Sequence, residues 1–446
     1  MDKLFFGTDG IRGRVGKPPI TPEFCLRLGW AVGRVFGKDK DCHVLIGKDT
    51  RISGYMMESV LESGLSSAGA NVTLLSVMPT PAIAYLTRTL RADAGIVISA
   101  SHNPYYDNGV KFFDGYGNKL DDQAERKIES ALSDEMICVD SKDLGKVSRL
   151  EAANGRYIEF CKATVDRSVS FSGIKLVIDC ANGANYHVGP KVFEELGAHV
   201  LSIGVNPNGI NINDKCGSTS PHYLSEEVKK TGADAGIAFD GDGDRAILIN
   251  EQGDVVDGDE ILYILARERL RKDSLVGGVV GTTMTNYGLE KALSDLAIPF
   301  QRADVGDRHV LDLLRATGWC LGGETSGHII CHDLASTGDG IVAALQVITA
   351  MVSNDVPLSE LTKGMTKLPQ VIKNVVLKNT DINPVKTSIV QKALEDKSND
   401  LGSKGRVVLR ASGTEKVIRI MVEGNDFDGI NKIADELAMV IGESIS

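Results

Sequence analysis

Short apolar runs that end in Gly, Asp, Ser or Asn recur in three successive regions of the chain, with helical patterns between them. The runs occupy residues 44–49, 71–77 and 94–100, then 175–180, 199–205 and 235–240, and then 276–283, 299–303 and 319–324. Continuous apolar strands that alternate with helices indicate parallel sheets covered on both faces. The recurrence predicts three similar mixed α/β domains. Amphipathic helices such as residues 55–68 and 225–231 fit between the strands, and residues 340–352 read as a buried helix.

The pattern of apolar and polar residues changes at about residue 369. Strand patterns cover residues 371–377, 406–410 and 417–422, and a closing helix is expected over residues 427–441. This order predicts a smaller C-terminal α+β domain. The length of 446 residues suits about three or four domains. We expect their boundaries at residues 1–150, 151–254, 255–367 and 368–446.

Composition excludes several classes of protein. The net charge of −11 argues against non-specific nucleic-acid binding, which needs a basic surface. The eight cysteines are scattered without a CxxC pair, and we expect buried, reduced thiols in a cytoplasmic protein. The N-terminus does not read as a signal peptide, and the longest near-apolar run is too short to span a bilayer.

The most distinctive loop is Asp240-Gly-Asp-Gly-Asp-Arg245, which follows an apolar strand. Its three carboxylates stand two residues apart, so in an extended backbone they project to one side. Like charges that converge in this way need a cation among them. Hard oxygen ligands without Cys or His favour Mg²⁺, Ca²⁺ or Mn²⁺. We therefore predict a metal site at Asp240, Asp242 and Asp244.

An EF-hand is the alternative for this loop, because Glu251 lies at the twelfth position from Asp240. Two features count against it. Arg245 stands where the sharp turn of an EF-hand needs Gly, and the flanking residues have strand patterns. Arg245 is instead suited to bind a phosphate beside the metal ion.

A second polar loop follows the strand at residues 94–98. It contains Ser101, His102, Asn103 and Pro104, and Pro104 forces a turn. An exposed serine next to a possible base could act as a nucleophile, although an ordinary polar turn has the same composition. Lys111 follows in a new strand that could place its ammonium beside the loop. The chain lacks a GxSxG elbow, so acyl transfer is not expected.

Two later loops offer groups for a sugar and for an anion. Residues 322–328 place Glu324, Ser326 and His328 among glycines at a strand end, which suits sugar hydroxyls or a turn with a structural histidine. The other loop is a Ser-Gly-Thr turn that could cradle an anion, and its groups are Arg410, Ser412, Gly413, Thr414 and Arg419. Basic residues in Gly-rich turns near residues 12–14 and 48–51 add positive charge. The four loops together indicate phosphoryl transfer on a phosphorylated sugar.

These loops resemble the four signature loops of the α-D-phosphohexomutase superfamily. The matching segments are residues 99–104, 240–245, 323–328 and 410–414, in the family's order and over essentially the whole chain. The opening Phe6-Gly-Thr-Asp-Gly-Ile-Arg-Gly13 and residues 46–54 are similar to those of the bacterial branch that acts on glucosamine phosphates. The resemblance implies four domains around a central cleft.

The resemblance also implies a reaction. Ser101 would carry a phosphoryl group, and one oxygen of it would join Asp240, Asp242 and Asp244 around one Mg²⁺. The enzyme, an isomerase, would interconvert glucosamine 6-phosphate and glucosamine 1-phosphate through a bound glucosamine 1,6-bisphosphate, and would feed UDP-N-acetylglucosamine and cell-wall precursor synthesis. Lys111 and His102 are the implied acid and base, with their division open, and Arg12 and Arg245 would hold the transferred phosphate.

The remaining residues would bind substrate. The implied set is Glu324, Ser326 and His328 for sugar hydroxyls, Arg410, Ser412, Gly413, Thr414 and Arg419 for the non-reacting phosphate, and Arg308 among the substrate contacts. Thr325 stands where relatives often have Asn, Gln or Met, which bears on selectivity between amino and hydroxyl sugars. Lys416 stands where a Pro is frequent.

The expected partner is a phosphorylated amino sugar, with no nucleic acid and no membrane, and a homodimer is one assembly compatible with the sequence. Three alternatives stay open. Within the superfamily the alternative is a phosphomannomutase/phosphoglucomutase. Outside it, a metal-dependent phosphatase could use an Asp of the acidic loop as its nucleophile, and a Ca²⁺-binding module would have no activity.

Overall fold

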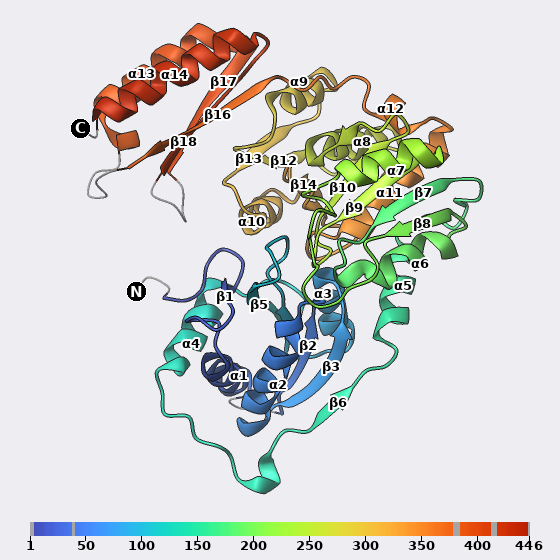
Figure 1. Ribbon diagram of the computed structural model, residues 1–446, viewed down its shortest axis with the longest axis vertical. Coiled ribbons are helices and arrows are strands. Elements are labelled where there is room, and N and C mark those ends of the chain that lie inside the picture. The colour runs from blue at the N-terminus through green and yellow to red at the C-terminus, as the bar shows by residue number, and fades with distance from the viewer. Residues whose placement is uncertain (1–3, 38–40, 378–383, 412–416, 445–446) are drawn as a thin grey trace. The chain divides into compact units, whose positions relative to one another are not determined.

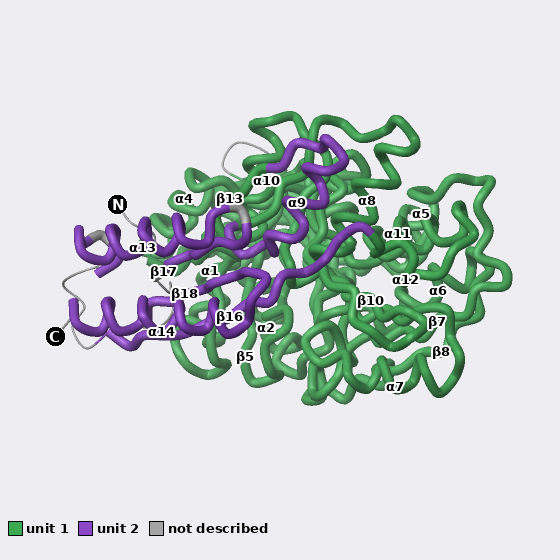
Figure 2. The backbone as a smooth tube through the Cα atoms, turned by 90° about the horizontal axis from the view of Figure 1, so that it is seen from above, with its two compact units in different colours: residues 1–282, 301–363 green, residues 283–300, 364–446 purple. Residues whose placement is uncertain are grey.

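The computed structural model describes residues 4–37, 41–377, 384–411 and 417–444. It divides into two compact units, which Figure 2 colours separately. The larger unit comprises residues 1–282 and 301–363, and the smaller unit comprises residues 283–300 and 364–446. Figure 1 labels the helices and strands.

The first sheet is mixed, with the strand order β1-β5-β4-β2-β3-β6. Its strands are β1 (Ile11–Arg14), β2 (His43–Lys48), β3 (Asn71–Val77), β4 (Ala94–Ile98), β5 (Asp107–Asp114) and β6 (Val147–Arg149). Its helices are α1 (Pro22–Phe36), α2 (Ile52–Ser67), α3 (Thr80–Thr89) and α4 (Asp122–Leu132). Strands β2, β3, β4 and β6 run parallel, whereas β5 runs antiparallel to β4 and β1.

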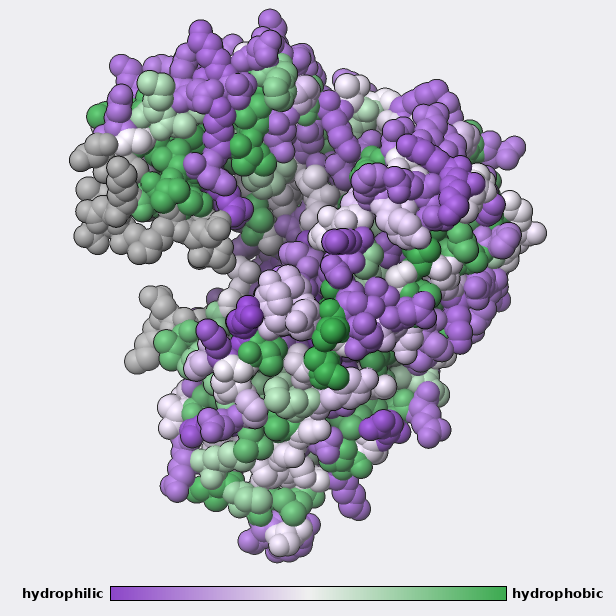
Figure 3. Space-filling view, viewed as in Figure 1, coloured by the Kyte–Doolittle hydropathy of each residue, from purple (hydrophilic) through white to green (hydrophobic). Residues whose placement is uncertain are grey.

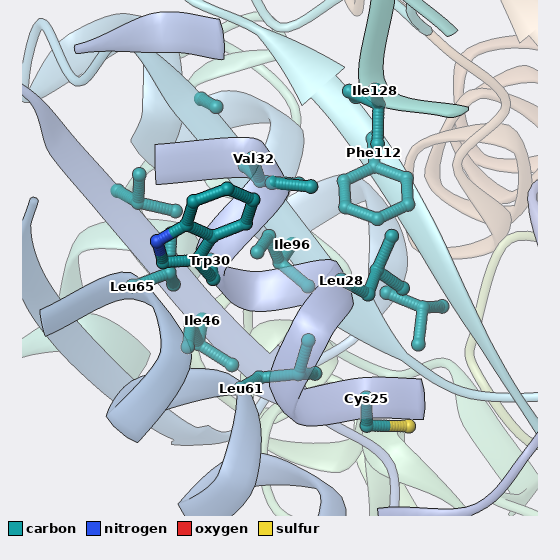
Figure 4. Packing of buried hydrophobic residues seen from close by; sticks show 14 of the residues in the cluster. Cys25, Leu28, Trp30, Val32, Ile46, Leu61, Leu65, Ile96, Phe112 and Ile128 are labelled. Carbon is teal, nitrogen blue, oxygen red and sulfur yellow. The ribbon is translucent and has the colours of Figure 1, made fainter. Parts of the chain in front are cut away.

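Helices cover both faces of this sheet because neighbouring strand residues point to opposite sides. Ile46 and Ile96 enter a core built with α1, α2 and α4, which Figure 4 shows. Gly47, which follows Ile46, and Gly95, which precedes Ile96, point to the other face and lie under α3. A Cβ at Gly47 would stand 2.5 Å from the Ile83 side chain, so α3 packs closely only because glycine is present.

The second sheet has the order β11-β10-β9-β7-β8. Its strands are β7 (Lys175–Asp179), β8 (His199–Ile203), β9 (Ala235–Phe239), β10 (Ala246–Asn250) and β11 (Val255–Val256), and the helices of this region are α5 (Ala153–Ala163), α6 (Val188–Glu195) and α7 (His222–Thr231). Strands β7, β8 and β9 are parallel, and β10 returns antiparallel to β9. The tight turn between β9 and β10 is the acidic loop.

The third sheet has the order β13-β12-β14-β15. Its strands are β12 (Val279–Thr282), β13 (Phe300–Ala303), β14 (Leu321–Gly323) and β15 (Ile329–Cys331), and the helices of this region are α8 (Gly258–Arg271), α9 (Tyr287–Asp295), α10 (Asp307–Thr317), α11 (Gly340–Asn354) and α12 (Leu358–Leu361). Helix α11 is buried along most of its length, as its apolar sequence predicts. The side chain of Asp339 caps it by accepting the Val342 N–H.

The C-terminal sheet is antiparallel, with the order β16-β18-β17. Its elements are β16 (Gln370–Val376), β17 (Gly405–Ala411), β18 (Val417–Gly424), α13 (Ser388–Leu401) and α14 (Phe427–Ser444). This region also contains the short 3₁₀ helices Pro384–Lys386 and Gly402–Lys404, and two others lie earlier in the chain at Ser141–Asp143 and Ala184–Tyr186. A separate apolar core that includes Ile420 and Leu437 lies between this sheet and its helices.

The structure confirms the predicted fold class, with three mixed α/β regions and a smaller α+β region. The sheets contain antiparallel strands at their edges, so the expectation of purely parallel sheets is wrong in detail. The expectation of buried cysteines is also wrong for two of the eight free thiols, because Cys138 is exposed and Cys320 is half-buried.

No helix in the described part of the chain combines the length and the apolar character needed to cross a bilayer. On the face drawn in Figure 3, hydrophobic residues are interspersed with hydrophilic ones. Single exposed apolar side chains of this kind are normal on protein surfaces.

Candidate active site

Three of the predicted loops follow the carboxyl ends of strands in the larger unit. The serine loop (residues 99–104) follows β4, the metal loop (residues 240–245) follows β9, and the sugar loop (residues 323–328) begins at the last residue of β14. Ligands of open α/β sheets bind at such strand ends. The structure brings the serine loop and the metal loop into direct contact, and the sugar loop lies against the end of the metal loop.

Ser101 is buried and holds a backbone conformation that is uncommon for a residue with a side chain. Its φ is +52°, in the left-handed region. Its Oγ donates a hydrogen bond to Oδ2 of Asp240 at 2.6 Å, and Nδ1 of His102 lies 3.2 Å from the same Oγ. The serine hydroxyl therefore lies against a carboxylate of the metal loop and an imidazole.

The carboxylates of Asp240, Asp242 and Asp244 form a buried cluster. One oxygen of each lies within 4.8 Å of the others. Oδ1 of Asp242 and Oδ1 of Asp244 are buried without a hydrogen-bond partner among the described residues. The turn depends on its glycines, since a Cβ at Gly241 would stand 2.6 Å from the carbonyl oxygen of Ser101. The flanking elements are strands β9 and β10, which excludes the helix–loop–helix of an EF-hand.

The donor set and its electrostatics fit a hard divalent cation. Burial and the neighbouring carboxylates of Asp242 and Asp244 raise the pKa of Asp240 well above its usual range. A cation among the three groups would relieve this repulsion and would bind the two carboxylate oxygens that accept no hydrogen bond in the described structure. The cluster is therefore compatible with Mg²⁺ binding.

Lys111 lies beside the same cluster. Its Nζ is 2.7 Å from Oδ2 of Asp242, 3.4 Å from Oδ2 of Asp244 and 3.0 Å from Oδ2 of Asp9. Burial lowers the pKa of Lys111, but the carboxylates of Asp242, Asp9 and Asp244 outweigh burial and raise it well above its usual value. The ammonium is thus held charged next to the predicted metal ligands.

Asp9 joins further basic residues to this network. Its carboxylate forms ion pairs with Arg12 and Lys119, and Lys119 also pairs with Asp307 of α10. Although burial raises the pKa of Asp9, the Lys111, Lys119 and Arg12 charges outweigh it and hold the pKa well below its usual range. The structure therefore places the predicted residue Arg12 in this ionic network.

His102 and Arg245 lie close enough to interact electrostatically. Burial, together with the charges of Arg245 and Arg12, lowers the pKa of His102 to about 4. The backbone N–H of Arg245 donates to Oδ1 of Asp240 at 3.2 Å. Nε of Arg245 is buried without a hydrogen-bond partner in the described structure, so its guanidinium has a donor available for an anion.

The sugar loop turns sharply between β14 and β15. Glu324, Thr325 and Ser326 are half-buried, whereas His328 is buried. Oε1 of Glu324 accepts the N–H of Gly306 at 3.0 Å, and the hydroxyl of Thr325 donates to the buried carboxylate of Asp259 at 2.9 Å. The loop therefore presents Glu324 and Ser326 at an accessible edge, with Thr325 tied to α8.

His328 points toward the metal loop. Its Nδ1 lies 3.6 Å from Oδ1 of Asp244, and its Nε2 lies 3.6 Å from Oδ2 of Asp307. Burial lowers the pKa of His328, but the Asp244, Asp307 and Glu324 carboxylates outweigh it and raise the pKa above its usual value. His328 thus connects the sugar loop with the metal loop.

Arg308, a predicted substrate contact, forms ion pairs with the first region of the chain. Its Nη2 lies 2.6 Å from Oδ1 of Asp122, and its Nη1 lies 3.3 Å from Oε2 of Glu125. Both acidic residues belong to α4. In this conformation the guanidinium of Arg308 is engaged by protein carboxylates.

The predicted anion turn belongs to the smaller unit. Arg410 of β17 and Arg419 of β18 are direct cross-strand partners. Like charges in opposite positions destabilise a sheet, so a bound anion would stabilise this pair. Ser412, Gly413 and Thr414 lie outside the described residues, as does Lys416.

Sequence reasoning did not single out several residues that complete the site. Thr80 donates to Oδ2 of Asp242 at 2.6 Å, and Asn213 donates to the carbonyl oxygen of Ser101 at 2.9 Å. Lys119 and Asp307 link two regions that are far apart in the chain. For Thr80 a signal was available, because it is a polar residue just after β3, whereas Asn213 lies in a long loop without a pattern.

Lys48 and Arg51, which the sequence predicted only to add positive charge, are buried. Arg51 is fully buried, and Lys48 is also buried and forms an ion pair with Glu58. Neither side chain is available as a surface charge for phosphate. Their contacts show that they support the first sheet and the serine loop.

Four family models match successive parts of the chain. The four domain models of phosphoglucomutase/phosphomannomutase match in order: alpha/beta/alpha domain I at residues 3–136, domain II at 155–253, domain III at 257–368 and the C-terminal domain at 359–440. Together these models cover most of the sequence.

Individual relatives agree with the models. The chain is 57% identical over 447 residues to a phosphoglucosamine mutase of Hahella chejuensis, covering 100% of both proteins. A phosphoglucomutase/phosphomannomutase family protein of Burkholderia thailandensis has a similar structure, with a TM-score of 0.82 at 22% identity and with 98% of this chain and 97% of that chain covered. The N-acetylphosphoglucosamine mutase of Aspergillus fumigatus, solved in complex with GlcNAc-6P and magnesium, matches with a TM-score of 0.67 at 17% identity, covering 100% of this chain and 96% of that chain.

Proposed function

The chain belongs to the phosphoglucosamine mutases of the α-D-phosphohexomutase superfamily, and from this premise we propose that it interconverts glucosamine 6-phosphate and glucosamine 1-phosphate. It is an isomerase that moves a phosphoryl group within its substrate. The identity of 57% to a phosphoglucosamine mutase over the full length supports this substrate. The product would serve UDP-N-acetylglucosamine and cell-wall precursor synthesis.

One observation carries the proposed chemistry. The hydroxyl of Ser101 lies 2.6 Å from Asp240, within a buried cluster of three carboxylates. A phosphoryl group on this oxygen would lie beside the cluster, which is where a bound divalent cation would neutralise its charge. We therefore propose Ser101 as the phosphoryl carrier.

Asp240, Asp242 and Asp244 are the residues proposed to hold Mg²⁺, together with an oxygen of phosphorylated Ser101. When bound, the ion supplies positive charge for the transferring phosphoryl group. The A. fumigatus relative is described as a complex with magnesium, which supports the choice of metal. Oδ1 of Asp242 and Oδ1 of Asp244 are buried and accept no hydrogen bond within the described structure, which supports the site in this chain.

The reaction proposed for Ser101 transfers its phosphoryl group and later recovers one. O1 of glucosamine 6-phosphate would attack phosphorus, and the bond between phosphorus and Ser101 Oγ would break as the O1–phosphorus bond forms. The O1 proton passes to a base, and Ser101 Oγ takes up a proton. The resulting glucosamine 1,6-bisphosphate turns over in the site, its 6-phosphoryl group returns to Ser101, and glucosamine 1-phosphate remains.

His102 and Lys111 are the proposed proton carriers. Nδ1 of His102 is 3.2 Å from the serine oxygen, within reach of a direct proton transfer. Lys111 lies against Asp242 and Asp9, where its ammonium would also contribute positive charge near the phosphoryl group. Arg12 and Arg245 are proposed to hold the transferred phosphate, because Arg12 pairs with Asp9 beside Lys111 and Nε of Arg245 lies 3.8 Å from Oδ1 of Asp244.

Substrate binding is proposed for the sugar loop and for the anion turn. Glu324, Ser326 and His328 would contact hydroxyl groups, and Arg410 with Arg419 would bind the phosphate that is not reacting. Ser412, Gly413 and Thr414 belong to the same proposal, as does Arg308 after it leaves Asp122 and Glu125. Binding one phosphate while the other reacts allows binding energy to orient the substrate.

The cellular setting is also a proposal. Eight free thiols support a reducing compartment, and we propose the cytoplasm. The domain boundaries at residues 150, 254 and 367 are supported by the ranges of the four family models. A homodimer stays a prediction, which the mass of the protein in solution would test.

The test compares three substrates in the presence of Mg²⁺. We expect kcat/KM for glucosamine 1-phosphate to exceed that for glucose 1-phosphate and mannose 1-phosphate by at least about tenfold, since recognition of one polar group can supply that difference. A clear preference for either hexose phosphate would instead favour the phosphomannomutase/phosphoglucomutase alternative.

A further inference from the structure

Arg51 is one of the largest fully buried side chains of the protein, and its hydrogen bonds converge on the serine loop. Its Nη2 donates to the carbonyl oxygens of Ser101 at 2.8 Å and Asn103 at 2.9 Å, and its Nη1 donates to that of Pro104 at 2.6 Å. Three of the six residues of the loop are therefore held through their backbone by one guanidinium.

Asp49 completes this arrangement from the other side. Its Oδ2 accepts Nε of Arg51 at 2.8 Å and the hydroxyl of Ser99 at 2.6 Å. The oxygen of Ser99 in turn accepts the backbone N–H of Ser101 at 2.9 Å. Arg51 therefore bonds directly to the carbonyl oxygen of Ser101, and Asp49 is connected to the N–H of Ser101 through the hydroxyl of Ser99.

A residue of the second region also holds the same carbonyl. Nδ2 of Asn213 donates to the Ser101 oxygen at 2.9 Å and to the Asn103 oxygen at 3.2 Å. The backbone groups of Ser101 are therefore occupied by protein partners, while its Oγ faces Asp240 and His102. This division fixes the backbone and leaves the reacting oxygen directed at the metal loop.

A buried ion pair is an expensive way to stabilise a fold, because desolvation offsets much of the attraction between the charges. Here it holds Ser101 at a φ of +52°, a conformation that costs free energy for a residue other than glycine. Phosphoryl transfer depends mainly on position, and a displacement of about 1 Å can reduce a rate by roughly 100-fold. A shift of Arg51 that moves the backbone of Ser101 is therefore expected to lower the rate of phosphoryl transfer.

We propose that Arg51, paired with Asp49, is a positioning residue for the transfer step. It acts through the backbone of Ser101 and contacts neither the metal cluster nor the sugar loop in any of its hydrogen bonds. The inference rests on the proposed role of Ser101 as phosphoryl carrier. The segment Lys48-Asp49-Thr50-Arg51 would thus orient the nucleophile and would not bind phosphate directly.

The test uses Arg51→Lys, which keeps the charge but loses the planar set of donors. We expect kcat to fall by roughly 100-fold while KM for glucosamine 6-phosphate changes by less than about threefold. The control is Arg27→Lys, because Arg27 of α1 likewise donates to two backbone carbonyls, those of Leu132 at the end of α4 and Asp134 just after it. Arg27→Lys should leave kcat within about twofold of the wild type.

Hydrogen–deuterium exchange of the peptide that covers residues 99–108 gives a second readout that does not need activity. Exchange should increase in Arg51→Lys and stay unchanged in Arg27→Lys. If Arg51→Lys does not fold, Asn213→Gly removes two other hydrogen bonds to the same loop and tolerates the positive φ at this position. It should lower kcat in the same way, with a smaller effect.

The outcomes separate the two proposals. A folded Arg51→Lys or Asn213→Gly variant with unchanged kcat and unchanged exchange would overturn the positioning role while leaving the mutase function intact. A wild-type protein without mutase activity would overturn the proposed function, and increased exchange in Arg51→Lys would then still support the control of the serine loop by Arg51.

Discussion

The serine loop and the sugar loop both follow a buried strand, yet different interactions hold them in place. Side chains from distant segments, led by Arg51 and Asn213, hold the backbone of the serine loop. Backbone hydrogen bonds contribute more to the sugar loop: the N–H of Glu324 donates to the His328 oxygen within the loop, and the Gly327 oxygen accepts the N–H of Ala246 from β10. The side chains of Glu324 and Thr325 also bond to neighbouring segments. The loop that is proposed to react is fixed by buried charges, and the loop that is proposed to bind is a short hairpin turn.

The difference suggests a division of labour. A nucleophile must be placed in one position relative to the metal loop, whereas a binding loop can adjust while it grips hydroxyl groups. Changes around the serine loop should therefore lower kcat, and changes around the sugar loop should raise KM.

Replacing the proposed nucleophile should abolish turnover. Ser101→Ala removes the oxygen that carries the phosphoryl group, and kcat should fall by roughly 10⁴-fold or more. The melting temperature should fall by only about a few degrees, because the hydrogen bond from Oγ to Asp240 is lost while the backbone contacts of Ser101 remain. Steady-state assays and thermal melting measure the two effects, and substantial residual turnover would remove Ser101 from the mechanism.

Removing the metal should reduce the rate without disturbing the sugar loop. Chelation with EDTA takes away several kcal/mol of charge stabilisation, which corresponds to a loss of about 10³-fold. Added Mg²⁺ should restore the rate in proportion to occupancy of the cluster at Asp240, Asp242 and Asp244. A protein that keeps full activity after exhaustive chelation would contradict the proposed metal site.

The metal loop also rests on a helix N-terminus whose support should depend on pH. Asp339 caps α11, and the next residue, Gly340, donates its N–H to the Gly243 oxygen. Burial raises the pKa of Asp339 from 3.8 to about 6, so the folded state favours the protonated acid by about 3 kcal/mol. This contribution to stability is fully present below about pH 4 and is lost as the pH rises through 6.

Asp339→Asn removes this titration while keeping an acceptor for the cap. The free energy of unfolding of the variant, relative to that of the wild type, should therefore increase between about pH 4 and pH 7. Urea denaturation at several pH values measures it. A difference between the two proteins that stays constant over this range would show that Asp339 does not titrate as described.

The smallest effect is expected in the sugar loop. Thr325→Val keeps the shape of the side chain but removes the hydrogen bond to Asp259, at a cost of about 1 kcal/mol in stability. KM for glucosamine 6-phosphate should rise by less than about tenfold, with a smaller change in kcat. Thr231→Val, which removes a hydroxyl bond to the Glu227 oxygen in α7, serves as the control. A loss confined to kcat would break the proposed contrast between the loops.

Much of the fold and the reactive part of the site could be predicted from the sequence. Apolar strands that alternate with helices are compatible with few folds other than α/β. The polar side chains at the strand ends lie in short segments, such as Asp240 to Arg245, that can be recognised locally. Ligands of α/β sheets bind beyond such strand ends, so the segments could be selected from local patterns. Their contact could not be predicted in this way, because β4, β9 and β14 belong to three different sheets.

The supporting residues could not be predicted in the same way, because their partners are remote in sequence. Arg51 contacts a loop fifty residues further along, and Asn213 reaches Ser101 from the loop between β8 and α7. Nothing in the residues around Arg51 distinguishes a buried side chain that supports a loop from a surface charge, and the sequence indicated only that Arg51 adds positive charge. Likewise, the ion pair of Lys119 with Asp307 depends on how two sheets pack together.

The most direct test of the account follows the phosphoryl group on Ser101. Protein that carries labelled phosphate on Ser101 would be mixed with one equivalent of glucosamine 6-phosphate and Mg²⁺, and the products would be separated in a single turnover. We expect the label in glucosamine 1,6-bisphosphate first and in glucosamine 1-phosphate afterwards, because O1 accepts the labelled group. Release of the label as inorganic phosphate would instead indicate a phosphatase and would contradict the mutase mechanism.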